Sequence, residues 1–100
     1  MKLKYQIILS PINEGLLVYI PDLDINTSGK NLTEAVDMAK DAISLWCITE
    51  QDMGREIPIP SAALFDRSEN DIVAWADVDL DAYRSTLESS YEAKKAVLPY

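Results

Sequence analysis

The chain has 100 residues, with 17 acidic against 9 basic side chains, a formal net charge of -8, one cysteine and no histidine. This length corresponds to one ordinary domain. The missing histidines exclude histidine-based nucleophile pairs and remove the commonest zinc ligand. Because Cys47 has no disulfide partner and no apolar run reaches the length of a membrane helix, we expect a cytoplasmic protein outside the membrane. Its acidic surface disfavours direct binding of nucleic acid.

Four segments have the sequence pattern of β-strands. Residues 3–10 alternate apolar and polar side chains, which predicts a half-buried strand. A turn with Pro, Asn and Gly leads to residues 16–20, so these two strands are expected to form a hairpin. Residues 25–28 predict a short third strand that closes at Gly29, and residues 72–78 alternate again as a fourth.

A long helix is predicted to begin after Asn31, where Glu34 has the spacing of a returning carboxylate in a capping box. The apolar residues of this helix lie on one stripe at spacings of three and four; they are Leu32, Ala35, Val36, Ala39, Ile43, Trp46 and Cys47. Ser44 is expected on the opposite, solvated face. Gly54 is predicted to end the helix, and the prolines of residues 57–60 predict an extended connector.

After the fourth strand, Asp79 or Asp81 can cap a second helix that keeps its helical spacing up to Leu87. The predicted fold class is therefore α+β, with a small antiparallel sheet of three to four strands packed by one long helix and followed by a short second helix. We expect residues 1–88 to form the domain and residues 89–100 to begin with a linker.

Several carboxylates follow or end the predicted strands. Asp22, Asp24, Asp77 and Asp79 could in principle gather around a divalent cation, as in a metal-dependent nuclease. In so acidic a chain, a solvated acidic edge is the more frequent result, and we expect neither a metal nor a cofactor.

The cysteine and the tryptophans are expected to have structural roles. Cys47 lies on the apolar helix stripe, where burial raises the pKa of a thiol, and no histidine is available to activate it. Trp46 and Trp75 are expected to be core or interface anchors, because base stacking normally accompanies a positively charged groove. We expect no catalytic residue.

Residues 17–61 contain PDLDI at 21–25, LTEA at 32–35 and EIPIPS at 56–61, in an order and at spacings that resemble the HicB family of antitoxins. The resemblance continues through VDLDAYR at 78–84. It implies a partial ribonuclease H-like fold without the nuclease centre, and residues 2–10 indeed contain no acid.

The resemblance also implies a function and partners. HicB proteins bind HicA, a small basic toxin that cleaves messenger RNA, and mask its active site without catalysis of their own; a homodimer is expected. From charge and helix-face arguments, the candidate toxin-binding residues are five acids that we expect to be exposed, Asp22, Asp24, Glu34, Asp37 and Asp41.

Relatives of this kind continue into a ribbon-helix-helix module that binds DNA and begins after a basic pair, here Lys94 and Lys95. The sequence stops near this point, so we expect DNA binding only through a module that is largely absent. Two alternatives remain open at this stage. The first is autorepression of the protein's own operon through that module, and the second, less favoured, is a divalent-metal nuclease.

Overall fold

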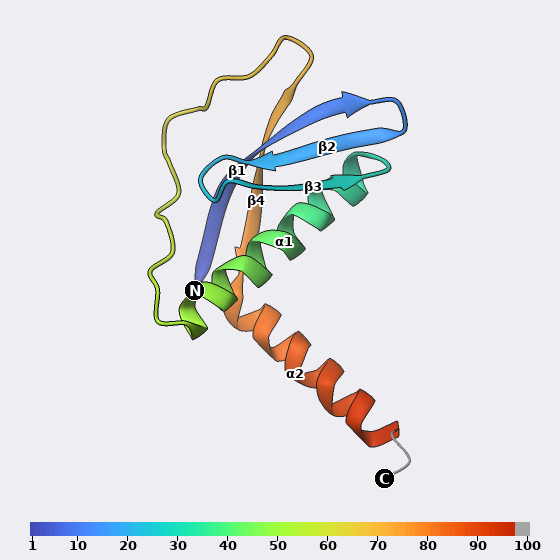
Figure 1. The fold of residues 1–100 in the computed structure, drawn as a ribbon, viewed down its shortest axis with the longest axis vertical. Helices are drawn as coiled ribbons and strands as arrows, with labels where there is room; N and C mark the ends of the chain where they lie inside the picture. The colour runs from blue at the N-terminus through green and yellow to red at the C-terminus, as the bar shows by residue number, and fades with distance from the viewer. Residues whose placement is uncertain (98–100) are drawn as a thin grey trace.

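The computed structural model describes the backbone of residues 1–97 and the side chains of residues 1–88. It has the predicted α+β architecture, in the order β1, β2, β3, α1, β4, α2 (Figure 1). The elements are β1 (Lys2–Ile12), β2 (Gly15–Ile20), β3 (Ile25–Gly29), α1 (Leu32–Asp52), β4 (Ile72–Asp79) and α2 (Leu80–Val97). None of the described helices is both long enough and apolar enough to cross a membrane.

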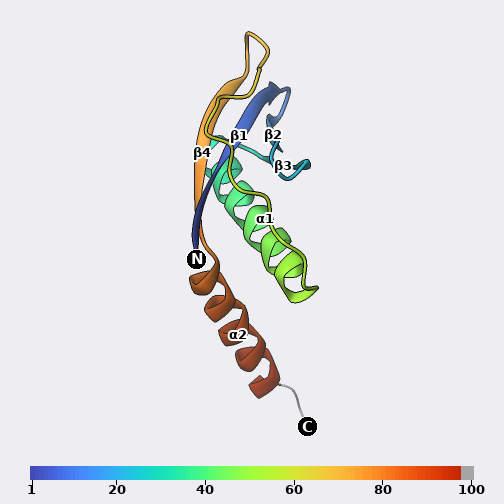
Figure 2. The same cartoon turned by 90° about the vertical axis from the view of Figure 1, so that its left-hand side faces the viewer.

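The four strands form one antiparallel sheet in the order β3-β2-β1-β4. β1 lies in the middle and pairs with β4 from Lys2↔Asp79 to Leu9↔Ile72. Helix α1 lies against one face of the sheet, and α2 leaves the end of β4 and extends away from the sheet (Figures 1 and 2). β3 and β4 are therefore the two edges of the sheet.

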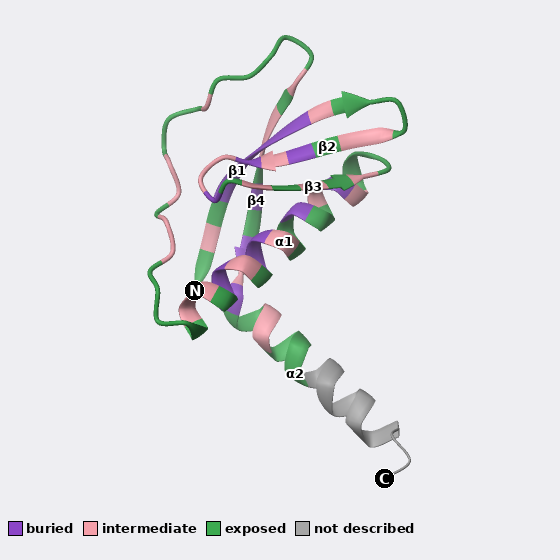
Figure 3. Ribbon diagram, viewed as in Figure 1, coloured by how far each residue is buried: buried purple, intermediate pink, exposed green. Residues whose placement is uncertain are grey.

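The core lies between the sheet and α1, where the buried residues gather (Figure 3). Alternate side chains of β1, including Ile7 and Leu9, point toward the helix, whose buried residues include Ala39 and Ile43. Small side chains let the helix approach the sheet closely. A Cβ atom on Gly29 would come within 2.4 Å of the backbone nitrogen of Ala35, so β3 must end in glycine.

Both predicted ends of α1 are confirmed. The side chain of Asn31 accepts a hydrogen bond from the backbone nitrogen of Glu34 at 2.9 Å, and Glu34 Oε1 accepts one from the backbone of Lys30 at 3.3 Å. Gly54 follows the last turn with φ of 75°, a backbone conformation that favours glycine. The prediction for Ser44 is wrong, since this residue is only 3% exposed. It lies where β4 and α2 cover the flank of α1.

The prediction that β1 is half-buried is also wrong, because residues 5–9 are all buried. The loop of residues 53–71 covers the face of β1 that points away from α1. Gln6 fastens this loop: its amide nitrogen donates to the carbonyl oxygens of Ser61 (3.1 Å) and Ala63 (2.6 Å), and its amide oxygen accepts from the backbone of Phe65 (3.0 Å). The side chain of Gln6 is fully buried and uses its donors and its acceptor.

Two further side chains hold the same loop. The carboxylate of Asp22, in the turn after β2, accepts hydrogen bonds from the backbone nitrogen of Ser61 at 2.9 Å and from its hydroxyl at 2.5 Å. The hydroxyl of Tyr5 donates to the carbonyl oxygen of Pro58 at 2.5 Å. The connector between α1 and β4 therefore has no regular secondary structure but is anchored at three points.

The second helix begins as predicted, because Asp79 Oδ1 accepts a hydrogen bond from the backbone of Ala82 at 3.2 Å. It continues to Val97, so the segment expected to begin with a linker at residue 89 starts as helix. The side chains of Lys94 and Lys95, and residues 98–100 altogether, lie outside the described residues.

Candidate functional site

An acidic groove of about 360 Å³ lies where α1, β4 and α2 meet. Its lining contains four carboxylate residues and one lysine, together with small and apolar side chains. The lining residues are Asp37, Lys40, Asp41, Ser44, Asp77, Val78, Asp79, Ala82, Tyr83 and Thr86. We call this feature the acidic groove.

The helical spacing of α1 brings Asp37 and Asp41 to the same side of the groove, because residues four apart lie one above the other on a helix. Both residues are exposed. The acids contributed by β4 have local partners. Asp77 lies 3.6 Å from the ammonium nitrogen of Lys4, and Asp79 caps α2. Asp37 and Asp41 are the two acids that α1 contributes to the groove, and Asp41 also has a local partner, the hydroxyl of Tyr83.

Tyr83 links the two helical walls of the acidic groove. Its hydroxyl donates a hydrogen bond to Asp41 Oδ1 at 2.7 Å. This bond, followed by partial burial and the negative charge of Asp41, raises the pKa of Tyr83 to about 12. The phenol thus stays neutral at physiological pH, and its ring forms part of the wall beside the carboxylate of Asp41.

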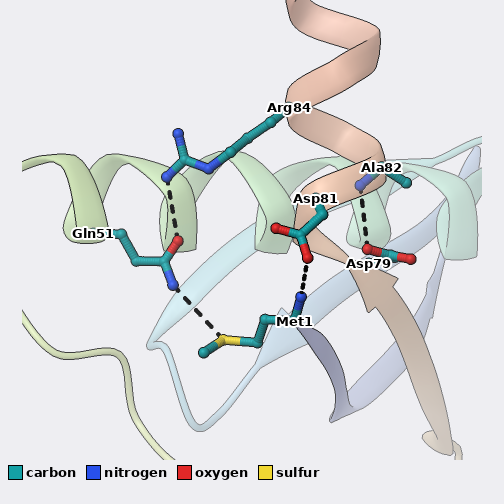
Figure 4. A network of polar contacts seen from close by, with 6 residues as sticks. All are labelled: Met1, Gln51, Asp79, Asp81, Ala82 and Arg84. Carbon is teal, nitrogen blue, oxygen red and sulfur yellow. Dashed lines mark hydrogen bonds and ion pairs between the residues drawn. The ribbon is translucent and has the colours of Figure 1, made fainter.

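A network of polar contacts holds the start of α2 against β1 and the last turns of α1 (Figure 4). Arg84 donates to the side chains of Gln51 at 3.2 Å and Asp52 at 2.9 Å. The amine of Met1 pairs with the carboxylate of Asp81, and this hydrogen bond and the positive charge lower the pKa of Asp81. These contacts join the start of α2 to the beginning of β1 and to the end of α1.

The structure divides the five predicted contact residues. Asp37 and Asp41 lie on the acidic groove, whereas Asp22 anchors the loop and Glu34 caps α1. Asp24 is exposed in the turn after β2, at φ of 52°, and accepts a hydrogen bond from Tyr19 at 2.8 Å. The expectation that all five carboxylates are exposed is wrong for Asp22 and Glu34, which are partly buried.

The structure does not bring the two aspartate pairs together. Asp22 and Asp24 contact Ser61 and Tyr19, at the turn between β2 and β3, while Asp77 and Asp79 lie at the end of β4. Among the residues whose side chains are described, no group of three or more His, Cys, Asp or Glu residues could hold a metal ion.

Cys47 is buried, as its place on the apolar stripe predicts. Burial is the main cause that raises the pKa of its thiol, although a hydrogen bond with Tyr5 opposes this effect. The thiol therefore remains protonated and unreactive at neutral pH. Of the two tryptophans, Trp46 is half-buried against the core, whereas Trp75 on β4 is 41% exposed.

The sequence did not reveal that Asp77, Asp79 and Tyr83 share a groove with Asp37 and Asp41. The pattern VDLDAYR at 78–84 predicts a strand end and a helix cap and continues the family resemblance, but it does not indicate a groove. The groove depends on how α2 is oriented against α1, and this orientation comes from long-range contacts such as that of Arg84 with Asp52.

No protein-family model and no curated protein matches the sequence. Among solved structures, a chain of a toxin-antitoxin complex from Streptococcus pneumoniae matches with a TM-score of 0.71 and 17% identity, over 83% of this chain and 73% of that one. A chain of the HicA3 and HicB3 toxin-antitoxin complex matches with a TM-score of 0.60 and 19% identity, over 77% of this chain and 99% of that one. The fold is one found in toxin-antitoxin complexes. This fold agrees with the resemblance of residues 17–61 to HicB antitoxins.

Proposed function

We propose that this protein is an antitoxin of the HicB type, which binds a basic HicA-type toxin and masks its RNA-cleaving site without catalysis of its own. The fold similarity to chains of toxin-antitoxin complexes supports an antitoxin role, and the order of the motifs between residues 17 and 61 supports the HicB type. The observation that carries the proposal is the acidic groove, a shallow and open surface at which four aspartates and one lysine lie around apolar side chains, and which suits a cationic partner.

The charge of the groove suits such a partner. A toxin that cleaves messenger RNA presents cationic side chains to phosphates, and the carboxylates of Asp37 and Asp41 can take the place of those phosphates. Complementary charge speeds diffusional encounter and disfavours wrong partners. The same charge repels nucleic acid, so this surface favours toxin binding over DNA or RNA binding.

The chemistry of the described residues also fits an inhibitor. The protein has no histidine, and its single thiol is buried and protonated. A protein that acts by covering the active site of another needs only a stable surface of the right shape and charge. The proposed location is the cytoplasm, where the messenger RNA substrate of the toxin is found.

The test is titration calorimetry of the protein against a HicA-type toxin, beside an RNA-cleavage assay of the mixture. We expect stoichiometric binding that stops cleavage. The double variant Asp37→Lys/Asp41→Lys should associate at least about tenfold more slowly at low salt and show a flatter salt dependence.

The matched control is Asp66→Lys/Glu69→Lys, which changes the net charge equally on the exposed loop beyond the groove. It should retain most of the association rate. If both double variants slow association equally, net charge rather than the acidic groove guides the toxin. If the folded wild-type protein does not bind the toxin at all, the proposed function is wrong.

A further inference from the structure

The two edges of the sheet differ in how well they are covered. β3 has five residues and packs against the start of α1. β4 has eight residues, and no strand of the described chain pairs with its outer side. In Figure 2, β4 forms the outer border of the sheet. Its outward-facing backbone N–H and C=O groups are therefore a template for one further strand.

Hollows lie beside β4 at both of its ends. The first half of β4 and the loop before it line a hollow of about 440 Å³. The second half, residues 77–79, lines two hollows. One, of about 520 Å³, is shared with the first residues of β1, and the other is the acidic groove, which is shared with α1 and α2. The described chain therefore leaves space for a partner from residue 72 to residue 79.

The first half of β4 exposes apolar side chains. Ile72 is 44% exposed, Trp75 is 41% exposed, and Leu64 of the adjacent loop is 69% exposed. Residues 72–76 contain no lysine, proline or glycine, the residues that commonly protect an edge against pairing. Exposed apolar side chains beside an unpaired strand indicate a surface that a partner covers.

The second half of β4 carries charge. On the face away from α1, Asp77 lies 3.6 Å from Lys4, and Asp79 lies opposite Lys2 in the pairing with β1. These lysines balance the two aspartates, so this face is close to neutral. The chemistry of a partner is therefore set by the other face, which borders the acidic groove.

On the face toward α1, Val78 packs in the core and also lines the acidic groove. Helix α1 contributes Asp37 and Asp41 to this groove, and Lys40 is the one cation among its described lining residues. Among the described residues, neither aspartate forms an ion pair. The hydrogen bond from Tyr83 occupies one of the two carboxylate oxygens of Asp41. The groove therefore keeps a net negative charge beside the edge of β4.

We propose that a strand of the HicA-type toxin pairs antiparallel with residues 72–79 of β4, an inference that rests on the proposed function. Residues opposite each other on paired strands point to the same face of a sheet. A toxin lysine or arginine opposite Val78 therefore points toward α1, where Asp37 and Asp41 lie. Toward the other end, an apolar side chain opposite Trp75 covers the indole. The strand that fits begins with basic residues and ends with apolar ones.

Charge favours the toxin over a second copy of this chain as the occupant of the edge. The chain has a net charge of -8, so two copies repel each other. β4 itself contains no basic residue that could enter the acidic groove of a second copy. A protein that binds RNA phosphates carries such residues on its surface.

The test is amide hydrogen exchange of the full chain, alone and with an equimolar amount of a HicA-type toxin. In the free protein, we expect every second amide of residues 72–79 to exchange rapidly, because these amides do not bond to β1. With the toxin bound, the same amides should exchange at least about tenfold more slowly, since they gain backbone hydrogen bonds. The amides of β3, at the opposite edge, are the internal control and should not change.

The variant Trp75→Lys places a charge on the apolar half of the edge. It should raise the dissociation constant for the toxin by about tenfold or more, mainly through faster dissociation, because edge contacts form after the encounter. The control Leu17→Lys makes the same charge change at a residue of similar exposure, 43%, on β2 and should bind as the wild type does. The fluorescence of Trp46 reports whether each variant is folded, and Ile72→Lys replaces Trp75→Lys if that variant does not fold.

The possible outcomes separate this inference from the proposed function. A folded wild-type protein that does not bind the toxin overturns both. A toxin that binds and is inhibited, while the amides of β4 exchange as in the free protein, overturns only the pairing. The pairing is also overturned if these amides are already protected in the free protein, because a second copy then occupies the edge.

Discussion

The two faces of β1 are both buried, but by different means. Toward α1, Ile7 and Leu9 are covered by apolar side chains such as Ile43. On the other face, the side chain of Gln6 is covered by a loop without regular structure, which it fastens through three hydrogen bonds. Burial of the first face depends on the volume of the apolar side chains that cover it. Burial of the second depends on hydrogen bonds whose donors and acceptors point in the right directions. We call the two faces the helix face and the loop face.

The largest expected effect comes from the helix face. Ile43→Ala removes buried methyl groups from the centre of the core and should lower the free energy of unfolding by about 2–5 kcal/mol. Urea denaturation followed by tryptophan fluorescence measures this loss. The control Leu45→Ala, at a half-exposed position of the same helix, should cost much less. Equal losses would mean that the core is not centred between α1 and β1.

The next effect tests the loop face. Gln6→Leu has a similar volume but leaves two carbonyl oxygens and one backbone N–H of the loop without their partner. We expect a loss of about 2–3 kcal/mol, because three part-buried polar groups of the loop lose their partner. The loop should also become more sensitive to proteases. The control is Lys4→Leu, on the same face but exposed. Unchanged protease sensitivity of Gln6→Leu would show that the loop is held by other contacts.

A smaller effect is expected at the second anchor. Asp22→Ala removes both hydrogen bonds to Ser61 and should cost about 1–2 kcal/mol, since the site is partly buried. Asp24→Ala, which removes only an exposed contact with Tyr19, is the matched control and should cost less. Hydrogen exchange of the amide of Ser61 reports the loss locally. An amide that exchanges equally fast in both variants would contradict the anchoring role of Asp22.

The smallest effect at neutral pH concerns Tyr5, whose ring packs in the core while its hydroxyl reaches the loop. Burial is the main cause that raises the pKa of Tyr5, and burial also raises that of Cys47. The folded state retains these protons longer than the unfolded state, so stability is complete below about pH 8, where the unfolded thiol and phenol are both protonated, and falls as the pH rises above it. Denaturation series from pH 7 to 11 should show this decline, and Tyr5→Phe should make it shallower. An equally steep decline in Tyr5→Phe would exclude the phenol as its cause.

The helix face could be predicted from the sequence because it follows local periodicity. The two faces of β1, the apolar stripe of α1 from Ala35 to Cys47 and the caps at Asn31 and Gly54 depend only on neighbouring residues, and the structure confirms them. The exceptions are Leu32, which was placed on the stripe but is 52% exposed, and the second face of β1, which is buried rather than solvated. Gln6 and Ser44 could not be placed in this way. A polar residue is assigned to the solvated face unless its partners are known, and the partners of Gln6 lie more than 50 residues away.

Of the candidate site, too, only the features that follow from local helix periodicity could be predicted from the sequence. Helix-face reasoning placed Asp37 and Asp41 together, and both line the acidic groove. It could not foresee that Asp22 would accept hydrogen bonds from Ser61, 39 residues along the chain, whereas the backbone bond of Glu34 is the one that its capping-box spacing predicts. The hydrogen bond from Tyr83 to Asp41 was also not predictable, because it depends on the packing of α2 against α1. Whether the groove contacts a toxin stays a prediction.

The loop of residues 53–71 is a place where the chain can be cut without removing β4 from the sheet. It joins α1 to β4, but β4 is held independently by its eight-residue ladder with β1. A single cut at the exposed residues near Glu69 would therefore separate two fragments that still share a continuous sheet. Expressed apart, residues 1–69 and 70–100 should reassemble when mixed, which makes this protein suitable as a split reporter.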